Sequence, residues 1–158
     1  MSMKIDKKLI DEILAKASVN ERLRQTFDLR TSSADSSQRM LNVLLPGTVV
    51  PIHRHQDTCE TVICLCGKLD EIIYEEVAEY INNDQSLFRF TETDNILKRT
   101  ILHEVERIRL CSAEACYGYQ VPKGVWHTVE ILEPSVIFES KDGTYVPLRQ
   151  EDVWNGQV

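Results

Sequence analysis

The fold is decided by the stretch Gly47-Thr-Val-Val-Pro-Ile-His53-Arg-His55-Gln-Asp-Thr-Cys-Glu60-Thr-Val-Ile-Cys-Leu-Cys-Gly67. Two histidines stand one residue apart, and a glutamate follows five positions after the second. Side chains alternate between the two faces of a strand, so we expect His53 and His55 to share a face, about 7 Å apart at the backbone. The polar residues before Glu60 predict a turn that brings the next strand back beside the first. These three side chains are therefore predicted to face one cavity.

A third histidine follows much later, in Pro122-Lys-Gly-Val-Trp-His127. Proline and glycine predict a rigid turn that leads into a new strand, and a ligand from a distant segment would close a metal polyhedron. Three neutral imidazoles and one carboxylate would hold one divalent transition metal with a net charge of about +1, which suits an anionic ligand or the activation of oxygen or water. The donor types leave iron, manganese, nickel and zinc open.

The rest of the chain predicts a mainly β protein with one or two short N-terminal helices. Apolar residues recur at helical spacing from Leu9 to Ala17 after the N-cap Asp6, and Ser18-Val-Asn-Glu21 fits a capping box for a second helix through about Thr26. From Gln38 onward, short apolar runs alternate with turn residues.

We expect strands at 39–45, 48–54, 60–66, 69–76, 86–91, 96–103, 106–111, 117–121, 126–132 and 135–140. Turns are expected at Pro46-Gly47, Gly67-Lys68, Thr93-Asp94-Asn95, Pro122-Lys123-Gly124, Glu133-Pro134 and Asp142-Gly143. Residues 77–85 are interpreted as a loop or a single helical turn.

The length of 158 residues predicts one domain, with a helical appendage and connector at 1–37, a β-barrel at 38–148 and a C-terminal tail at 149–158. The formal charge of −7 argues against a broad surface for nucleic acid or anionic membrane. No apolar stretch fits a signal peptide or a membrane span, and five cysteines, an odd number, favour a reducing compartment. We therefore expect a soluble, cytoplasmic protein without nucleic-acid or membrane partners.

The histidine motifs resemble the two sequence motifs of the cupin superfamily. The first motif is matched at every position, whereas the second has Cys116 and Ile131 in place of its usual glycine and asparagine. More narrowly, the chain resembles the WbuC family of cupin-fold metalloproteins over nearly its whole length. The stretches that support this are Asp6–Leu14, Gln38-Arg-Met-Leu-Asn42, Pro46-Gly47, His53-Arg-His55, Val121-Pro-Lys-Gly-Val-Trp-His127-Thr and Phe138-Glu-Ser-Lys-Asp-Gly-Thr-Tyr145.

This resemblance implies a single-domain, RmlC-like cupin fold, which is a double-stranded β-helix or jelly-roll barrel. It also implies a bound metal and an association with bacterial surface-polysaccharide gene clusters. The resemblance does not imply a known reaction.

Four cations lie within or beside the matching segments, and an arginine among them could hold a carboxylate or phosphate. Arg54 alternates with the two histidines and should point away from them, and Lys123 should lie on an exposed turn. Arg39 and Lys141 are therefore the candidate substrate-binding cations.

Three further residues could serve the site. Trp126 and Tyr119 could stack on a sugar ring, with core filling as the alternative. Glu139 is the candidate catalytic residue, because it could act as a general acid or base or accept a proton from a ligand histidine. A surface salt bridge is the alternative role for Glu139.

Several classes of function stay open. A metal-dependent isomerase or epimerase acting on a sugar or sugar nucleotide fits the polysaccharide association, and the same ligands would also serve a dioxygenase. A non-catalytic module that binds a sugar or small acid is another hypothesis, and in a third the metal only pins the strands. Exposed strand edges of a small barrel also predict a homodimer.

Overall fold

The computed structural model describes residues 3–82, 96–156 and 158. In this part of the chain, one α-helix precedes six β-strands and two short 3-10 helices. The elements are α1 (Lys7–Ser18), β1 (Arg24–Asp28), β2 (Ser37–Leu44), β3 (Glu60–Asn82), β4 (Ile96–Leu110), η1 (Ser112–Glu114), β5 (Gly118–Val121), β6 (Trp126–Asp142) and η2 (Gln150–Asp152). The prediction of a mainly β protein is confirmed. The strand expected at 86–91 and the turn at 93–95 lie outside the described residues. Among the described helices, none is both long and apolar enough to cross a membrane.

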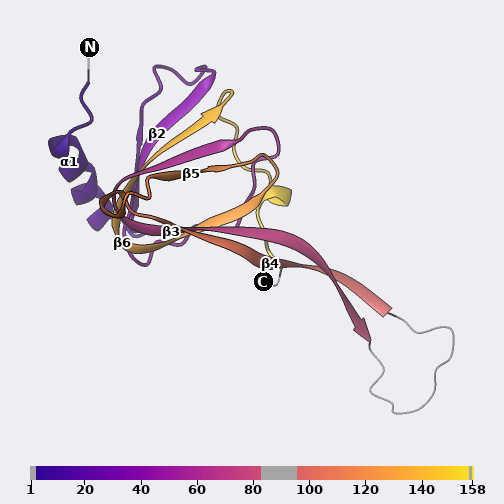
Figure 1. The fold of residues 1–158 in the computed structure, drawn as a ribbon. Coiled ribbons are helices and arrows are strands. Elements are labelled where there is room, and N and C mark those ends of the chain that lie inside the picture. Colours follow the sequence, from indigo (N-terminus) through magenta and orange to yellow (C-terminus); the bar gives the residue numbers. More distant parts are fainter. Residues whose placement is uncertain (1–2, 83–95, 157) are drawn as a thin grey trace, which may run out of the picture.

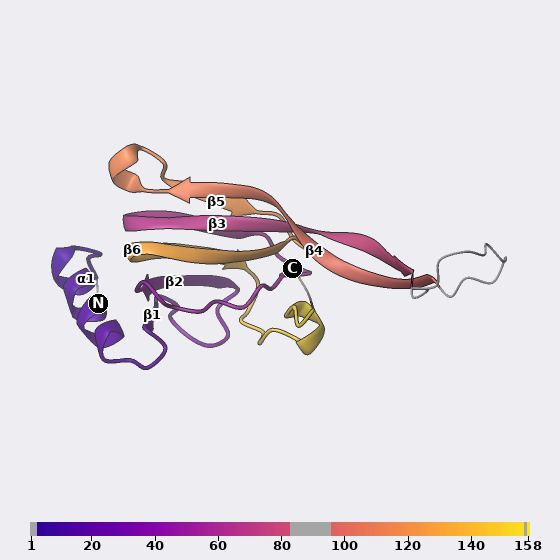
Figure 2. The same cartoon turned by 90° about the horizontal axis from the view of Figure 1, so that it is seen from below.

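The strands form one antiparallel sheet in the order β1-β2-β6-β3-β4, and β5 pairs with β3. Strand β3 is the centre of this arrangement. It pairs with β6 from Glu60↔Lys141 to Tyr74↔Trp126, while β5 joins its start and β4 joins it from Leu69 onward. Figure 2 shows the strands following one another across the molecule, and Figure 1 shows β3 and β4 continuing as a two-stranded ribbon beyond the body.

The two faces of β2 have different neighbours, because side chains alternate along a strand. Leu41 and Val43 pack under α1, against Ile13 and Ala17 of the helix. Asp6 begins that helix by accepting a hydrogen bond from the Leu9 amide at 3.1 Å. The alternate residues of β2 line a cavity instead. The helix therefore covers one side of the sheet and leaves the other side for the site.

The second helix expected over 18–26 is absent, and this prediction is wrong. The amide of Val19 ends α1, and the Asn20 side chain then accepts a hydrogen bond from the Arg22 amide in a turn. Residues Arg24–Asp28 pair with β2 instead. The Ser-x-x-Glu pattern has helical propensity, but antiparallel pairing with β2 outweighs it.

Two expected turns lie inside continuous strands. Gly67 has φ of +88°, and the register between β3 and β6 shifts around it, so the predicted strands 60–66 and 69–76 form one element. Glu133-Pro134 lies similarly within β6. Strand β3 also continues through Asn82, where a loop or helical turn was expected from residue 77.

The strand expected at 48–54 is not formed. His53 makes only isolated β-bridges, to His127 and to Val153. The expected alternation on a strand is therefore not what brings the histidines together.

Candidate metal centre

Four side chains converge where the motif segments meet. One potential ligand atom from each of His53, His55, Glu60 and His127 lies within 4.8 Å of the corresponding atoms of the other three. The ring centroids of the histidines are 4.3 to 5.6 Å apart. The structure thus brings together all four residues predicted from the sequence spacing.

Backbone pairing fixes the relative positions of two of these histidines. The His53 amide donates to the His127 carbonyl at 3.0 Å, and the His127 amide donates to the His53 carbonyl at 2.8 Å. The turn before His127 is anchored as well, because the Gly124 amide donates to the His55 carbonyl at 2.7 Å. Gly124 has φ of +79°, a conformation that glycine adopts without strain. The Pro-x-Gly turn therefore ties the two motifs to each other.

The ring orientations of His53 and His127 are set by carbonyl oxygens. Their Nδ1 atoms lie 3.0 Å from the Pro51 carbonyl and 2.9 Å from the Val125 carbonyl, respectively. A ring that donates from Nδ1 presents the Nε2 lone pair, which is the arrangement of metal-binding histidines.

The Nε2 atom of His127 gives the strongest indication that the cluster binds a metal ion. It is buried and has no hydrogen-bond partner among the described residues, and Oε2 of Glu60 is 3.7 Å away. A buried polar atom without a partner is costly, and a divalent ion held by this nitrogen and its neighbours would remove the cost. The donor set of three nitrogens and one oxygen fits zinc, iron, manganese or nickel.

Glu60 is almost fully buried and stays ionised. Burial alone would raise its pKa, but the neighbouring rings of His127 and His55 and the charge of Lys141 outweigh it, so the pKa lies well below its usual value. Lys141 donates to Glu60 at 3.1 Å and lies 3.3 Å from Nε2 of His55. A metal in this cluster would compete with the ammonium group for both ligands.

The imidazoles respond to the same burial in different ways. Burial, with a contribution from His127, lowers the pKa of His53 to about 4. Burial also acts to lower the pKa of His127, but the Glu60 carboxylate outweighs it and the pKa lies above the usual value. His53 is therefore neutral at pH 7, as a metal ligand must be, and protons compete with a metal more strongly for His127 than for His53.

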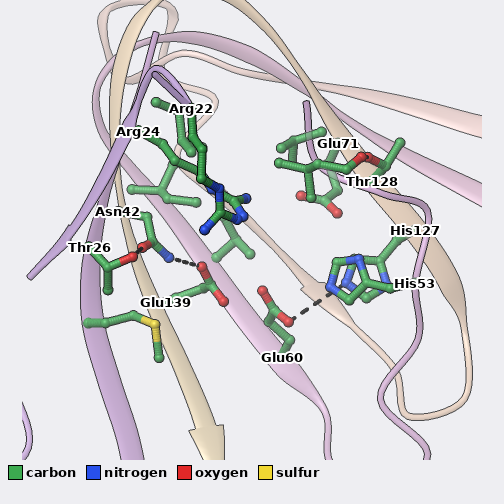
Figure 3. A pocket seen from close by; sticks show the side chains of 16 residues that line it. Arg22, Arg24, Thr26, Asn42, His53, Glu60, Glu71, His127, Thr128 and Glu139 are labelled. Carbon is green, nitrogen blue, oxygen red and sulfur yellow. Dashed lines mark hydrogen bonds and ion pairs between the residues drawn. The ribbon is translucent and has the colours of Figure 1, made fainter. Parts of the chain in front are cut away.

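A cavity of about 260 Å³ adjoins this cluster, between β1, β2, β3 and β6 (Figure 3). His53, Glu60 and His127 form part of its wall, and Glu139 of β6 forms another part. The Asn42 amide donates to one oxygen of Glu139, and Lys141 donates to the other at 2.9 Å. Burial and the nearby charge of Glu60 raise the pKa of Glu139 to about 7. A carboxyl group with this pKa can both give and take a proton near neutral pH.

Glu71 of β3 also lines this cavity. Its side chain is fully buried, and neither carboxyl oxygen has a hydrogen-bond partner among the described residues. Burial raises the pKa of Glu71 to about 8. The group is therefore mainly protonated at neutral pH.

The structure places the other candidate residues differently. Lys141 lies beside the cluster and borders a second, more open hollow of about 440 Å³. Arg39 projects from the face of β2 opposite to that of Asn42, and it donates to Asp35 at 2.8 Å. Neither cavity is lined by Arg39, Trp126 or Tyr119.

The two aromatic candidates are held by core and surface contacts. Trp126 is buried, donates to Glu76 at 2.8 Å and lies under the guanidinium of Arg54. Tyr119 packs against an apolar cluster and donates to Glu106 at 3.2 Å. These contacts correspond to the core-filling alternative.

Six polar residues of the cavity were not predicted as site residues, namely Arg22, Arg24, Thr26, Asn42, Glu71 and Thr128. Arg22 and Arg24 alternate with Leu23, a two-residue period that points to a strand but was masked by the expected helix. Glu71 follows Asp70 and stands directly before the apolar residues Ile72, Ile73 and Tyr74, so the sequence alone does not show that its side chain is buried. Asn42 ends a stretch that supports the family resemblance, but the sequence does not mark it as a cavity residue.

The comparisons with known proteins address family and fold. A family model described as "Domain of unknown function (DUF6016)" matches residues 5–86. The chain belongs to this family. The matched part of the DUF6016 chain contains His53, His55 and Glu60, and His127 follows beyond it. No curated protein sequence shows significant similarity to this chain.

Similar solved structures have the cupin fold. The capsular polysaccharide assembling protein CapF from Staphylococcus aureus aligns with a TM-score of 0.51 and 16% identity, over 89% of this chain and 31% of CapF. CapF with the inhibitor 3-isopropenyl-tropolone gives 0.50 and 19%, over 89% of this chain and 33% of that one. An oxalate oxidase in complex with the substrate analogue glycolate aligns with a TM-score of 0.49 and 15% identity, over 94% of this chain and 66% of the oxidase. This chain thus spans about a third of CapF, and the likeness to CapF shows that the DUF6016 chain has a cupin-type jelly-roll fold.

Proposed function

We propose that this protein is a metal-dependent cupin enzyme that isomerises or epimerises a small sugar-related molecule. The observation that carries the proposal is the buried, unpartnered Nε2 of His127, which converges with His53, His55 and Glu60 on the wall of a cavity. A divalent ion held there would supply a Lewis acid that polarises a carbonyl or hydroxyl oxygen of the substrate.

Glu139 is the proposed acid or base of this reaction. It lies in the wall of the same cavity, and its raised pKa of about 7 suits proton transfer at neutral pH. Asn42 donates to one of its oxygens and Lys141 to the other, so the carboxyl group has a fixed direction. Isomerisation and epimerisation by this route move a proton from or to the carbon adjacent to the polarised carbonyl group. This proton transfer is the step assigned to Glu139.

Solvent exchange tests this function. Metal-loaded protein is incubated in D2O with hexoses, hexose phosphates and UDP-glucose, and deuterium entering carbon positions is followed by NMR. We expect exchange with at least one compound, and Glu139→Gln should reduce its rate by about 100-fold or more while metal content is retained. The matched control is Glu133→Gln, an exposed residue of the same strand, which should exchange at the wild-type rate.

A dioxygenase is the second candidate, supported by the same three-histidine, one-glutamate donor set. Oxygen consumption with any of these compounds, without deuterium incorporation, would favour it. Tight binding with neither reaction would favour the binding module.

The proposal also includes a finer family, a pathway, a location in the cell and an oligomeric state. WbuC-family membership and a role with bacterial surface polysaccharide are supported by the motif residues and by the fold shared with CapF, a capsular polysaccharide assembling protein. A cytoplasmic location is supported by the five free cysteines. A homodimer is supported by the edge strands β1 and β4.

A further inference from the structure

Two arginines enter the cavity from the side of β1. Arg24 begins β1 and stands opposite Leu44 of β2, and Arg22 precedes it in the turn after α1. Both residues line the cavity that contains His53, Glu60 and His127, where Arg24 is half-buried and Arg22 is exposed to solvent. Figure 3 shows both side chains directed into its interior, across from the histidines.

Neither guanidinium group has a protein partner. Among the described residues, no hydrogen bond or ion pair involves the side chain of Arg22 or Arg24, although three glutamates line the same cavity. The carboxylates of Glu60 and Glu139 are instead engaged by Lys141, and Asn42 also binds Glu139. Two guanidinium groups that face one cavity without a counter-ion match an anionic ligand, because the fork of donors fits carboxylate and phosphate oxygens.

The two arginines of the second hollow, in contrast, have protein partners. Arg54 is already bound to Asp152 at 3.1 Å and to Glu76 at 3.2 Å. Arg149 in the same hollow is bound to Asp152 at 2.8 Å. The partnerless arginines therefore single out the cavity at β1 as the anion site.

The size of this cavity limits the ligand. Its volume of about 260 Å³ lies below the range of roughly 300 to 1,000 Å³ that is typical for drug-sized ligands. A compound of a few carbon atoms with one anionic group fits this space.

We propose that the substrate is a small organic acid whose carboxylate or phosphate group is held by Arg22 and Arg24 while its other end faces the metal cluster. This inference rests on the proposed function for the second contact only. The arginine contact does not require the metal. It narrows the sugar-related substrates of the proposed function to small ones that carry a carboxylate or phosphate group.

Isothermal titration with three-carbon probes tests the inference. The probes are glycerate, which carries a carboxylate, glycerol 3-phosphate, which carries a phosphate, and glycerol, which carries no charge. Each probe is titrated into chelator-treated and zinc-loaded protein. The variants are Arg22→Gln, Arg24→Gln and the double variant. Arg99→Gln is the control, because Arg99 lies on β4 and pairs with Glu79 outside the cavity.

We expect at least one acid to bind in both metal states, and glycerol to bind much more weakly. The double variant should lose about 10- to 100-fold in affinity, because each charge-assisted hydrogen bond contributes substantially to binding. Arg99→Gln should bind like the wild type, and circular dichroism should show that every variant is folded. Tighter binding of glycerate identifies a carboxylate, and tighter binding of glycerol 3-phosphate identifies a phosphate.

Three results would overturn the inference. They are equal affinity in the double variant and the wild type, binding of glycerol as tight as that of the acids, and no binding of either acid. Failure of the metal proposal gives a different pattern, in which the arginine-dependent affinity is the same with chelator and with zinc, and no zinc is retained.

Discussion

Glu71 shows how much one buried carboxyl group can decide in this protein. It is enclosed within β3 and lines the cavity without a hydrogen-bond partner in the described residues. An ionised carboxylate in such a place is expensive, so the folded state keeps the proton. Three carboxyl groups of the site thus differ in protonation at neutral pH. Glu60 is ionised, Glu139 has a pKa of about 7, and Glu71 is mainly protonated.

Replacing Glu71 by glutamine should stabilise the metal-free protein at alkaline pH. The folded pKa of about 8 lies above the usual value of 4.5, so the folded state binds more protons between these values and stability falls as pH rises. Glu71→Gln should match the wild type near pH 4.5 and exceed it above pH 8 by on the order of a few kcal/mol. Urea unfolding with a chelator present measures this difference.

Glu75→Gln is the control, because Glu75 is an exposed residue of the same strand and should show little difference at either pH. A Glu71→Gln variant that is no more stable than the wild type at pH 8.5 would contradict this account of Glu71.

The continuity of β3 depends on Gly67, which the sequence predicts to lie in a turn between two strands. Gly67 has φ of +88°, and a Cβ atom there would lie 2.2 Å from the Pro134 carbonyl oxygen and 2.5 Å from Ser135 Oγ. Only glycine allows β3 and β6 to approach this closely while their register shifts. A turn glycine and a bulge glycine look alike in sequence, which is why two strands were expected in place of one.

Gly67→Ala should therefore cost at least about 3 kcal/mol of unfolding free energy, through the backbone strain and the clash together. Gly143→Ala provides the comparison, because Gly143 has φ of +81° and nothing lies within 4 Å of its added Cβ. That variant should lose only about 1 to 2 kcal/mol. Equal losses in urea unfolding of the two variants would show that the contact with Pro134 is unimportant.

The elements also show what can be predicted from sequence and what cannot. The helix α1 was predicted from its apolar period, and the meeting of His53, His55, Glu60 and His127 from their spacing. The reason given for that meeting was wrong, because backbone bridges between His53 and His127 replace the expected strand.

Strand β1 was missed because its pairing with β2 is a tertiary interaction that local propensity does not report. The two arginines at the cavity, Arg22 and Arg24, were therefore not predicted either, because the expected helix would have placed them elsewhere. Residues brought to a site by long-range pairing therefore escape sequence reasoning unless a motif marks them.

At the scale of the whole molecule, a metal would tie the segment of His53 and His55, which the sheet joins only through isolated bridges, to the paired strands β3 and β6. His53 and His55 lie between β2 and β3 outside any named strand, Glu60 begins β3 and His127 lies in β6. A ligand that binds only the folded state at 100 times its dissociation constant stabilises it by about 2.7 kcal/mol. We expect zinc to raise the unfolding temperature accordingly.

This stabilisation should shrink as the pH falls. Glu60 holds the pKa of His127 above its usual value, so protons compete with the metal for this ring below neutrality. Thermal unfolding with zinc and with chelator should differ clearly at pH 7.5 and little at pH 5.5. An equal difference at both pH values would show that zinc binds elsewhere.

The most direct test of the metal centre is elemental analysis of the protein purified without added metal. We predict about one divalent transition metal per chain in the wild type and in His103→Gln, whose histidine is exposed on β4 outside the cluster, and almost none in a folded His127→Gln variant. Equal metal content in wild type and His127→Gln, or no metal in wild-type protein taken from its native host, would contradict the account.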